Sequence, residues 1–504
     1  MKKTIICLIL ALALLPFTQA GAQTRPSINW YEVFVYSYAD SDGDGHGDLK
    51  GLEGKLDYIA GMGYDGLWLM PVMPSPSYHK YDVSDYYGID PLYGTLTDMR
   101  SLVAACHARG IRLIIDLVLN HSSTRHPWFI QATDALRAGN LEEPHIDWYN
   151  FTQQPGGSRV KVPGADWYYE EQFAGGGMPD LNLDNMALRE EIRAIMAFWL
   201  NDVGVDGFRL DAVTSYYSGD DKKNIEFLLF LKDTAEGLKP GSFLVGECWK
   251  GLGVIADYYD SGIDSFFLFP ASQAEGYIAS SMRARKPAAT FVKHLERVQA
   301  AIPAGLLTPF LSNHDTGRTV GLVQGRQAVE RVKFAHGLLS LLGGSTFTYY
   351  GEEIGMAGAG ADPNKRLGML WEDGQPVTKA PPGVTGGEYP FPGVKAQQED
   401  PMSLLNYLKA LNRLRLELPV LALGELAILE HTDDTCLLAR ALNGEALYIA
   451  VNFSSKEARE VLVPQRLTLL GALDTDDTAS AAVSGARGTL VSLPPYGIAF
   501  LGIE

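Results

Sequence analysis

The sequence predicts an α/β fold: a (β/α)₈ TIM barrel, with a subdomain inserted after the third strand and an antiparallel β-sandwich domain at the C-terminal end. Three patterns predict it. Eight short apolar runs alternate with stretches of helical period, a long aperiodic segment interrupts them after the third run, and short alternating runs follow near the C-terminus. An open doubly wound sheet would show similar alternation, but no GxGxxG opens a helix after the first strand.

The predicted strands are short, mostly apolar runs bounded by polar residues or glycine. They are Val33–Tyr38, Gly66–Met70, Ile111–Leu119, Gly207–Leu210, Phe243–Glu247, Ser265–Phe269, Leu307–Ser312 and Thr346–Tyr350. The predicted helices between and after them have apolar residues three and four positions apart. They are Leu52–Ala60, Asp98–Arg109, Met186–Leu200, Lys223–Leu238, Phe291–Ala300, Gln327–Leu342 and Ser403–Leu416.

Two segments depart from this alternation. Residues 121–184 are rich in Gly, Pro, Trp and Tyr and show little helical period, which is typical of an inserted subdomain rather than of a loop. After about Leu418, runs such as CLLARAL and ALYIAVNF alternate like antiparallel strands. The predicted divisions are a signal peptide at 1–22, the barrel at 23–120 and 185–418, the insert at 121–184 and the β-sandwich at 419–504.

The charge balance excludes one class of partner. The 504 residues contain 42 Lys and Arg against 60 Asp and Glu, a net charge of −18. Such a chain repels phosphate backbones, so we expect no nucleic-acid partner. The excess of carboxylates leaves some available to bind cations. The oligomeric state does not follow from the sequence.

The first residues have the order of a secretory signal. Lys2 and Lys3 precede an apolar run over Ile5–Phe17, and small residues follow, with cleavage expected after Ala20 or Ala22. The run is shorter than the ~20 residues that a membrane span needs. We therefore expect a secreted or periplasmic protein with no stable membrane insertion.

Acidic and basic residues collect where four predicted strands end. The segments are DLVLNH, GFRLDAV, GECW and FLSNHD, at residues 116–121, 207–213, 246–249 and 310–315. In a barrel these ends meet on one face, where the chemistry of such folds takes place. Asp211, Glu247 and Asp315 should therefore point into one cleft. A lone carboxylate at a strand end is more often a cap or an ion-pair member, but three from separate strands, beside Arg209 and two histidines, indicate a catalytic site.

These four segments resemble the four conserved regions of glycoside hydrolase family 13, the α-amylase family. The resemblance extends to TRHPWF (124–129), MPDLN (178–182) and HKYDVSDYYGIDPLYGT (79–95), and it covers about residues 28–420. The motifs occur in the family's order on the expected strands. The resemblance implies a barrel with an insert and a C-terminal domain, and an enzyme that hydrolyses α-glucans.

The resemblance also implies roles for single residues. Asp211 matches the nucleophile, Glu247 the acid/base and Asp315 the third carboxylate, which holds sugar hydroxyls. Arg209 lies two residues before the nucleophile and should keep it ionised. The matches to sugar-binding positions are His121, His314 and Tyr81 in the cleaved subsite, and Asp362 with Arg366 at the neighbouring non-reducing-side sugar. Read without the resemblance, the histidines and Tyr81 could be packed barrel residues, and Asp362 with Arg366 a solvated ion pair.

The chemistry explains why these residue types are needed. A glycosidic bond breaks through a cation-like transition state, in which one carboxylate attacks and an acid protonates the leaving oxygen. The family retains configuration, which implies that Asp211 and Glu247 lie about 5–5.5 Å apart. Glu247 must be protonated when substrate binds, so we expect nearby Asp211 and Asp315 to raise its pKa. No organic cofactor is needed.

The loop DSDGDGHGD at residues 40–48 predicts a structural Ca²⁺ site. Its carboxylates are hard oxygen ligands on a flexible backbone, and the position expected for an EF-hand glutamate holds Gly51 instead. The same loop occurs in some family members, where it implies the ligands Asp40, Asp42, Asp44, Asp48 and the carbonyl of His46. A polar turn without an ion is the alternative.

A second Ca²⁺ often joins the barrel to the insert in α-amylases. Asn120 and Asp180 match two of its side-chain ligands. Ser215 stands where many α-amylases have a histidine that binds through its carbonyl.

MPDLN lies between the segments typical of the oligo-1,6-glucosidase group and the neopullulanase group, and secreted α-amylases share it. We expect no N-terminal starch-binding domain before Ile28. The favoured activity is endo-hydrolysis of α-1,4-glucosidic bonds in starch and maltooligosaccharides. The alternatives are an oligo-1,6-glucosidase, a neopullulanase-like enzyme, a transglycosylating α-glucanase and, more remotely, a non-catalytic glucan-binding relative, which would typically lack catalytic carboxylates.

Overall fold

The computed structural model describes residues 27–173, 175–323, 328–475, 480–485 and 488–503. The predicted signal peptide, residues 1–22, lies outside them. Within the described residues, no helix is long and apolar enough to cross a bilayer.

Eight parallel strands form the central sheet, in the order β10-β9-β8-β7-β3-β2-β1-β11. They are β1 (Asn29–Val33), β2 (Gly66–Leu69), β3 (Arg112–Leu117), β7 (Gly207–Leu210), β8 (Phe243–Gly246), β9 (Ser265–Phe267), β10 (Leu307–Thr308) and β11 (Thr346–Tyr349). A parallel bridge between Phe310 and Phe347 joins the segment after β10 to β11, so the two edges meet. The predicted TIM barrel is confirmed.

Two apolar layers follow from the two-residue period of the strands. One phase of side chains fills the barrel interior with Trp30, Trp68, Phe243 and Phe347, among others. The opposite phase packs outward against the surrounding helices in one continuous core. Gly66 pairs with Trp30 in the register, and a Cβ at Gly66 would meet the Trp30 ring at 2.4 Å, so the missing side chain makes room for the indole.

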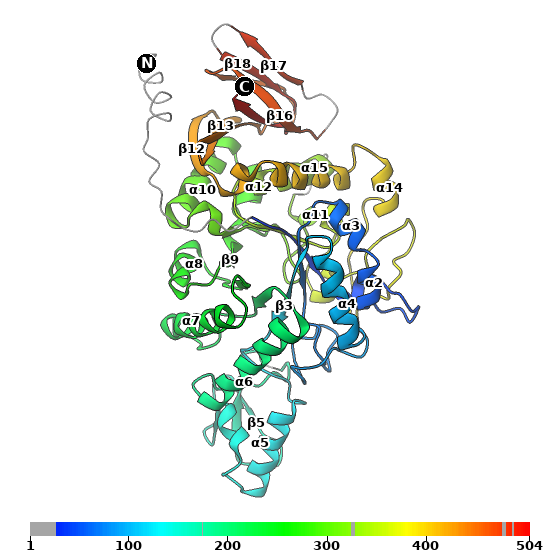
Figure 1. The fold of residues 1–504 in the computed structure, drawn as a ribbon, viewed down its shortest axis with the longest axis vertical. Helices are drawn as coiled ribbons and strands as arrows, with labels where there is room; N and C mark the ends of the chain where they lie inside the picture. Colours follow the sequence, from blue (N-terminus) through cyan, green and yellow to red (C-terminus); the bar gives the residue numbers. More distant parts are fainter. Residues whose placement is uncertain (1–26, 174, 324–327, 476–479, 486–487, 504) are drawn as a thin grey trace.

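The helices that surround the barrel and follow it are short to medium in length (Figure 1). They are α2 (Leu49–Glu53), α3 (Leu56–Gly61), α4 (Leu96–His107), α6 (Met186–Ala197), α7 (Asp221–Leu238), α8 (Leu252–Tyr258), α9 (Tyr277–Arg283), α10 (Pro287–Ala301), α11 (Thr319–Leu322), α12 (Ala328–Ser340), α13 (Asp362–Lys365), α14 (Val394–Glu399), α15 (Leu404–Glu417) and α16 (Pro419–Leu423). A π-helical segment, Phe198–Val203, continues α6.

The insert projects from one end of the barrel (Figure 1). It holds α5 (Pro127–Ala138) and a small antiparallel sheet of β4 (Phe151–Thr152), β6 (Tyr168–Glu170) and β5 (Arg159–Lys161). An antiparallel bridge between His121 and Asp180 joins the start of the insert to its end.

The C-terminal domain contains two packed antiparallel sheets at the opposite end of the molecule from the insert (Figure 1). Its strands are β12 (Glu425–His431), β13 (Thr435–Leu442), β14 (Glu445–Asn452), β15 (Arg459–Val463), β16 (Leu467–Leu473), β17 (Ser480–Gly485), β18 (Gly488–Leu493) and β19 (Ile498–Ile503). Apolar residues from both sheets, including Leu437, Tyr448 and Val491, form the core between them, as expected of a β-sandwich.

Several predictions differ from the structure. The first strand is Asn29–Val33, and the predicted run Val33–Tyr38 mostly forms a buried loop with a 3-10 turn, because an apolar run marks burial and not extended structure. The predicted helix over Leu52–Ala60 is broken between α2 and α3. The insert contains α5, whose start at Pro127 and left-handed Gly139 end are ordinary helix boundaries that the scarce apolar period concealed.

Gly207 opens the strand that carries Arg209 and is followed by Asp211. Its φ is 148°, and a Cβ there would lie 1.9 Å from the carbonyl oxygen of Phe243 on β8. Gly207→Ala should lower the free energy of unfolding in urea by about 3 kcal/mol or more, since the clash is with backbone. Gly237→Ala, on α7 with open space around its Cβ, should instead raise it by about 0.5 kcal/mol. Equal effects of the two variants would contradict this.

Candidate active site

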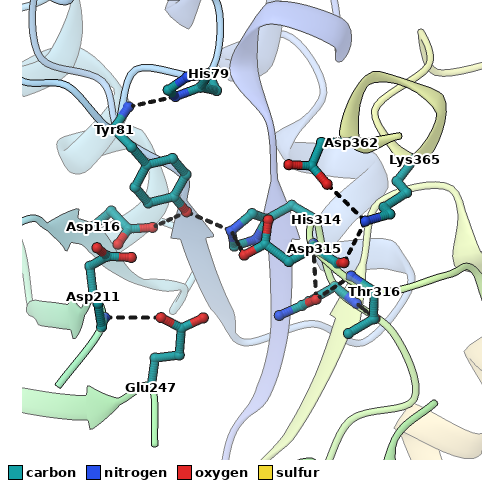
Figure 2. Close-up of polar contacts among 12 residues, drawn as sticks. His79, Tyr81, Asp116, Asp211, Glu247, His314, Asp315, Thr316, Asp362 and Lys365 are labelled. Atoms are coloured by element: carbon teal, nitrogen blue, oxygen red, sulfur yellow. Dashed lines mark hydrogen bonds and ion pairs between the residues drawn. The ribbon is translucent and has the colours of Figure 1, made fainter. Parts of the chain in front are cut away.

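The three predicted carboxylates meet in one cleft. Asp211 directly follows β7, Glu247 directly follows β8, and Asp315 lies in the loop after β10. The cleft has a volume of about 420 Å³. Its lining residues are His79, Tyr81, His121, Phe173, Met178, Asp211, Ala212, Glu247, Trp249, Asp315, Asp362 and Arg366. Side chains from distant parts of the chain are thus brought to the carboxyl ends of the strands (Figure 2).

The guanidinium of Arg209 joins three carboxylates at the floor of this cleft. Its Nη1 lies 2.6 Å from Asp116 Oδ1 and 2.6 Å from Asp211 Oδ1, and its Nη2 lies 2.9 Å from Glu247 Oε1. Arg209 is 1% exposed, so these contacts replace its hydration almost entirely. The predicted contact between Arg209 and Asp211 is present, and the same side chain also holds Glu247.

Glu247 is arranged to keep a proton. Burial raises its pKa to about 7; Arg209 opposes this shift, and Asp211 and Asp315 add to it. The pKa of Glu247 is therefore raised, as expected. Burial is the largest cause of the rise, and the neighbouring carboxylates contribute less. The backbone N–H of Ala212 donates to Glu247 Oε2 at 2.9 Å. Ala212 has a φ of 47°, a left-handed conformation uncommon for alanine, in the residue immediately after Asp211.

Asp315 has the opposite electrostatic environment. Burial opposes its ionisation, but the cations His314, Arg366 and Arg209 outweigh burial and hold the pKa of Asp315 well below its usual range. His314 Nε2 lies 3.1 Å from Asp315 Oδ2, and Arg366 Nη2 lies 2.9 Å from Oδ1. The cleft therefore combines one carboxyl group whose pKa is raised to about 7 with one whose pKa is held well below its usual range.

Tyr81 lines the cleft, and the fully buried His314 lies next to it (Figure 2). Their rings stack with centroids 5.5 Å apart, and the Tyr81 hydroxyl lies 2.6 Å from His314 Nε2. The same hydroxyl donates to Asp116 Oδ2 at 3.2 Å. The Tyr81 ring is thereby held in one orientation beside the carboxylates.

His121 lies on the side of the insert. Burial lowers its pKa, which favours the neutral imidazole. Its buried Nε2 has no hydrogen-bond partner among the described residues, and its ring contacts Phe173 edge to face at 5.3 Å. A buried nitrogen without a partner beside a cleft is available to a ligand.

Asp362 and Arg366 lie together at the far rim, as their spacing predicts. Arg366 Nη2 is 3.7 Å from Asp362 Oδ2, and Lys365 Nζ is 2.8 Å from Asp362 Oδ1. Arg366 is 2% exposed, whereas the side chain of Asp362 is 56% exposed. The pair is therefore not a solvated ion pair, since Arg366 is buried and also binds Asp315.

The loop over residues 40–48 gathers three of its four aspartates. Carboxylate oxygens of Asp40, Asp42 and Asp48 all lie within 4.8 Å of one another. Among the described residues this is the one group of three or more acidic, histidine or cysteine ligands so close together. Asp44 lies apart from it and accepts from the backbone N–H of His46 at 2.6 Å.

The two side chains predicted to bind a second Ca²⁺, Asn120 and Asp180, are hydrogen-bonded to protein groups. Asn120 Nδ2 donates to Asp180 Oδ1 at 3.1 Å, and the backbone N–H of Gln172 donates to Asp180 Oδ2 at 3.0 Å. Burial raises the pKa of Asp180 to about 6. The two side chains do meet where the insert joins the barrel, and metal binding there stays a prediction.

Several residues of the site were given no definite role from the sequence. Asp116 begins the DLVLNH segment, so its position at a strand end was the available signal. Trp249, about half exposed, lines the cleft and stacks on Phe269 at 4.6 Å. Phe173 belongs to the insert, where no pattern marked it.

Known proteins share this architecture. A family model described as the α-amylase catalytic domain matches residues 32–424. "Alpha-amylase 3" of Dictyoglomus thermophilum is 38% identical over 426 residues, 82% of each chain. "Oligo-1,6-glucosidase" of Parageobacillus thermoglucosidasius is 28% identical over 518 residues, 84% of this chain and 90% of that relative. The solved structure "Eubacterium rectale Amy13B" has a TM-score of 0.88 and 39% identity, and covers 96% of this chain and 98% of its own.

The chain therefore belongs to the α-amylase family, glycoside hydrolase family 13. The resemblance seen in the sequence motifs is confirmed, and the protein is a glycoside hydrolase family 13 enzyme with a TIM-barrel catalytic domain.

Proposed function

We propose that this protein is a retaining hydrolase that cleaves α-1,4-glucosidic bonds within starch and maltooligosaccharides. The observation that carries the proposal is the cluster of Arg209 with Asp211 and Glu247, which faces the ionised Asp315 across one cleft. The likeness to a relative named as an α-amylase supports the choice of substrate.

The reaction proceeds in two steps. In the first, an oxygen of Asp211 bonds to the anomeric carbon while the glycosidic oxygen leaves with the proton of Glu247. In the second, a water oxygen bonds to that carbon, its proton passes to Glu247, and the bond to Asp211 breaks. Asp315 binds hydroxyls of the distorted sugar. Tyr81, His121 and His314 contact the sugar being cleaved, and Asp362 with Arg366 contacts the next one.

The product profile tests this proposal. Soluble starch should yield a series of maltooligosaccharides early in the digestion, because cleavage within the chain precedes accumulation of small sugars. Asp211→Asn should lose more than about 10⁴-fold of the rate of reducing-sugar release, since it lacks the nucleophile. Glucose as the sole early product, or cleavage of isomaltose, would favour the oligo-1,6-glucosidase alternative that a 28% identical relative raises. If wild type released no more reducing sugar than Asp211→Asn, a glucan-binding protein would be favoured.

The pH dependence follows from the proton of Glu247. Burial raises its pKa to about 7, so the proton donor is lost as the pH rises through about 7. For maltooligosaccharides, kcat/KM should fall about tenfold per pH unit above that value. For α-maltosyl fluoride, whose fluoride leaves without protonation, the fall should be absent. Glu247→Gln should lose about 10²–10⁴-fold on maltooligosaccharides and still release a burst of fluoride. The same alkaline fall for both substrates would contradict the role of Glu247.

We further propose that Asp40, Asp42 and Asp48 hold a structural Ca²⁺, with Asp44 and the carbonyl of His46 as additional oxygen ligands. Three carboxylates this close repel one another, and a cation with hard oxygen preference relieves that repulsion. The carboxylate of Asp40 is already ordered by the backbone N–H groups of Gly43 and Gly45, both at 2.7 Å. Asp48 also caps α2.

Calcium should accordingly raise the thermal unfolding midpoint. The stabilisation is expected to reach about 2.7 kcal/mol at one hundred times the dissociation constant, and EDTA should reverse it. Asp42→Asn should abolish the calcium-dependent shift, whereas Asp57→Asn, an exposed carboxylate paired with Arg109, should keep it. An equal shift in the Asp42 variant would place the ion elsewhere.

The localisation proposal rests on the sequence of residues 1–22. We propose that this segment directs export and is removed, which suits digestion of a polymer outside the cytoplasm.

A further inference from the structure

Glu32 is a buried carboxylate that neither the sequence motifs nor the proposed mechanism uses. It lies on β1, is 1% exposed, and its Oε1 is 2.5 Å from Nδ1 of His314. The backbone N–H of His314 also points to the same oxygen, at 3.4 Å. Two donors of one histidine thus converge on one carboxylate oxygen beneath the cleft.

The other ring nitrogen of His314 also faces acceptors. Nε2 lies 2.6 Å from the Tyr81 hydroxyl and 3.1 Å from Asp315 Oδ2. The Tyr81 hydroxyl donates to Asp116, so its oxygen can accept from Nε2. A neutral imidazole has a single N–H and would leave one of these two sides without a proton. The doubly protonated ring donates on both sides.

The charged and titratable groups around His314 come from several elements of the barrel. They are Glu32 on β1, Tyr81 after β2, Asp116 on β3, Arg209 on β7, the adjacent Asp315, and Arg366 after β11. Burial favours the neutral ring, but Asp315 and Glu32 outweigh it and raise the pKa of His314 to about 10. The two carboxylates in direct contact therefore favour the charged ring. Burial also raises the pKa of Glu32, and the contact with His314 opposes that rise.

We propose that Glu32 is a positioning residue that keeps His314 doubly protonated and oriented, so that a permanent imidazolium N–H stands beside Asp315 and the sugar being cleaved. This rests on the proposed function, because it takes the cleft as the subsite for that sugar. The cation keeps Asp315 ionised and fixes the Tyr81 ring through Nε2. Glu32 acts only through His314 and does not line the cleft.

Glu32→Gln is the informative variant, because it preserves shape and a hydrogen-bonding oxygen but removes the charge. Glu353→Gln is its matched control. Glu353 is also fully buried, and its Oε1 accepts from the hydroxyls of Tyr31 and Tyr58 at 2.5 and 3.0 Å. The control therefore removes a buried carboxyl group from the 3-10 turn that follows β11, where it bonds to Tyr31 and Tyr58 and not to His314, and reports the effect of lost stability alone.

The first measurement is the protonation state of His314 itself, by ¹⁵N NMR of histidine-labelled protein, with the signal assigned by its loss in His314→Gln. In wild type and Glu353→Gln both ring nitrogens should remain protonated at pH 8. In Glu32→Gln the ring should lose a proton between pH 6 and 9. A neutral His314 at pH 8 in wild type overturns the proposal even if Glu32→Gln does not fold, and an unchanged titration in that variant overturns it as well.

The second measurement is kcat/KM for α-maltosyl fluoride from pH 6 to 9, where ionisation of Glu247 should have no effect. Wild type and Glu353→Gln should give flat profiles. Glu32→Gln should gain a one-proton alkaline limb, with a fall of about tenfold per pH unit above its midpoint. A flat profile in a folded Glu32→Gln enzyme overturns the catalytic part of the proposal. If wild type cleaves no α-glucan, the proposed function fails, and the NMR titration still decides whether Glu32 sets the charge of His314.

Discussion

One buried guanidinium sets the geometry of the catalytic face. Arg209 holds Asp116, Asp211 and Glu247 within hydrogen-bond distance of a single planar group. Each of these carboxylates comes from a different strand or its end, so the barrel must close in one register to bring them together. Without the cation, three acids in a water-poor cleft would repel one another and take up protons. The positive charge lets them coexist in one small volume.

The site consists of two linked ion clusters. Arg209 organises the carboxylates that make and break bonds, while His314 and Arg366 surround Asp315 on the opposite side. Tyr81 connects the two clusters, because its hydroxyl contacts both Asp116 and His314. A proton gained or lost in one cluster therefore changes the potential in the other, and the proton affinities belong to the whole network.

The sequence was most informative where chemistry and periodicity coincide. Asp211, Glu247 and Asp315 follow apolar runs, so both the strands and the convergence of the acids could be predicted. The bounds of the first strand could not be predicted, because Phe34–Tyr38 is as apolar as a strand but forms a buried loop. Glu32 was missed for a related reason: it sits inside a strand, and its partner His314 lies 282 residues away. No local pattern reveals a contact made across a closed barrel.

The bridge between His121 and Asp180 has an evolutionary consequence. The chain leaves the barrel for the insert and returns from it at neighbouring positions, which this bridge joins. Phe173 and Met178 come from the insert and line the cleft. Substitutions at these two positions change the lining without replacing any residue of the barrel strands that carry the acids. Chimeras made at this junction would combine a different cleft lining from the insert with the same carboxylates of the barrel.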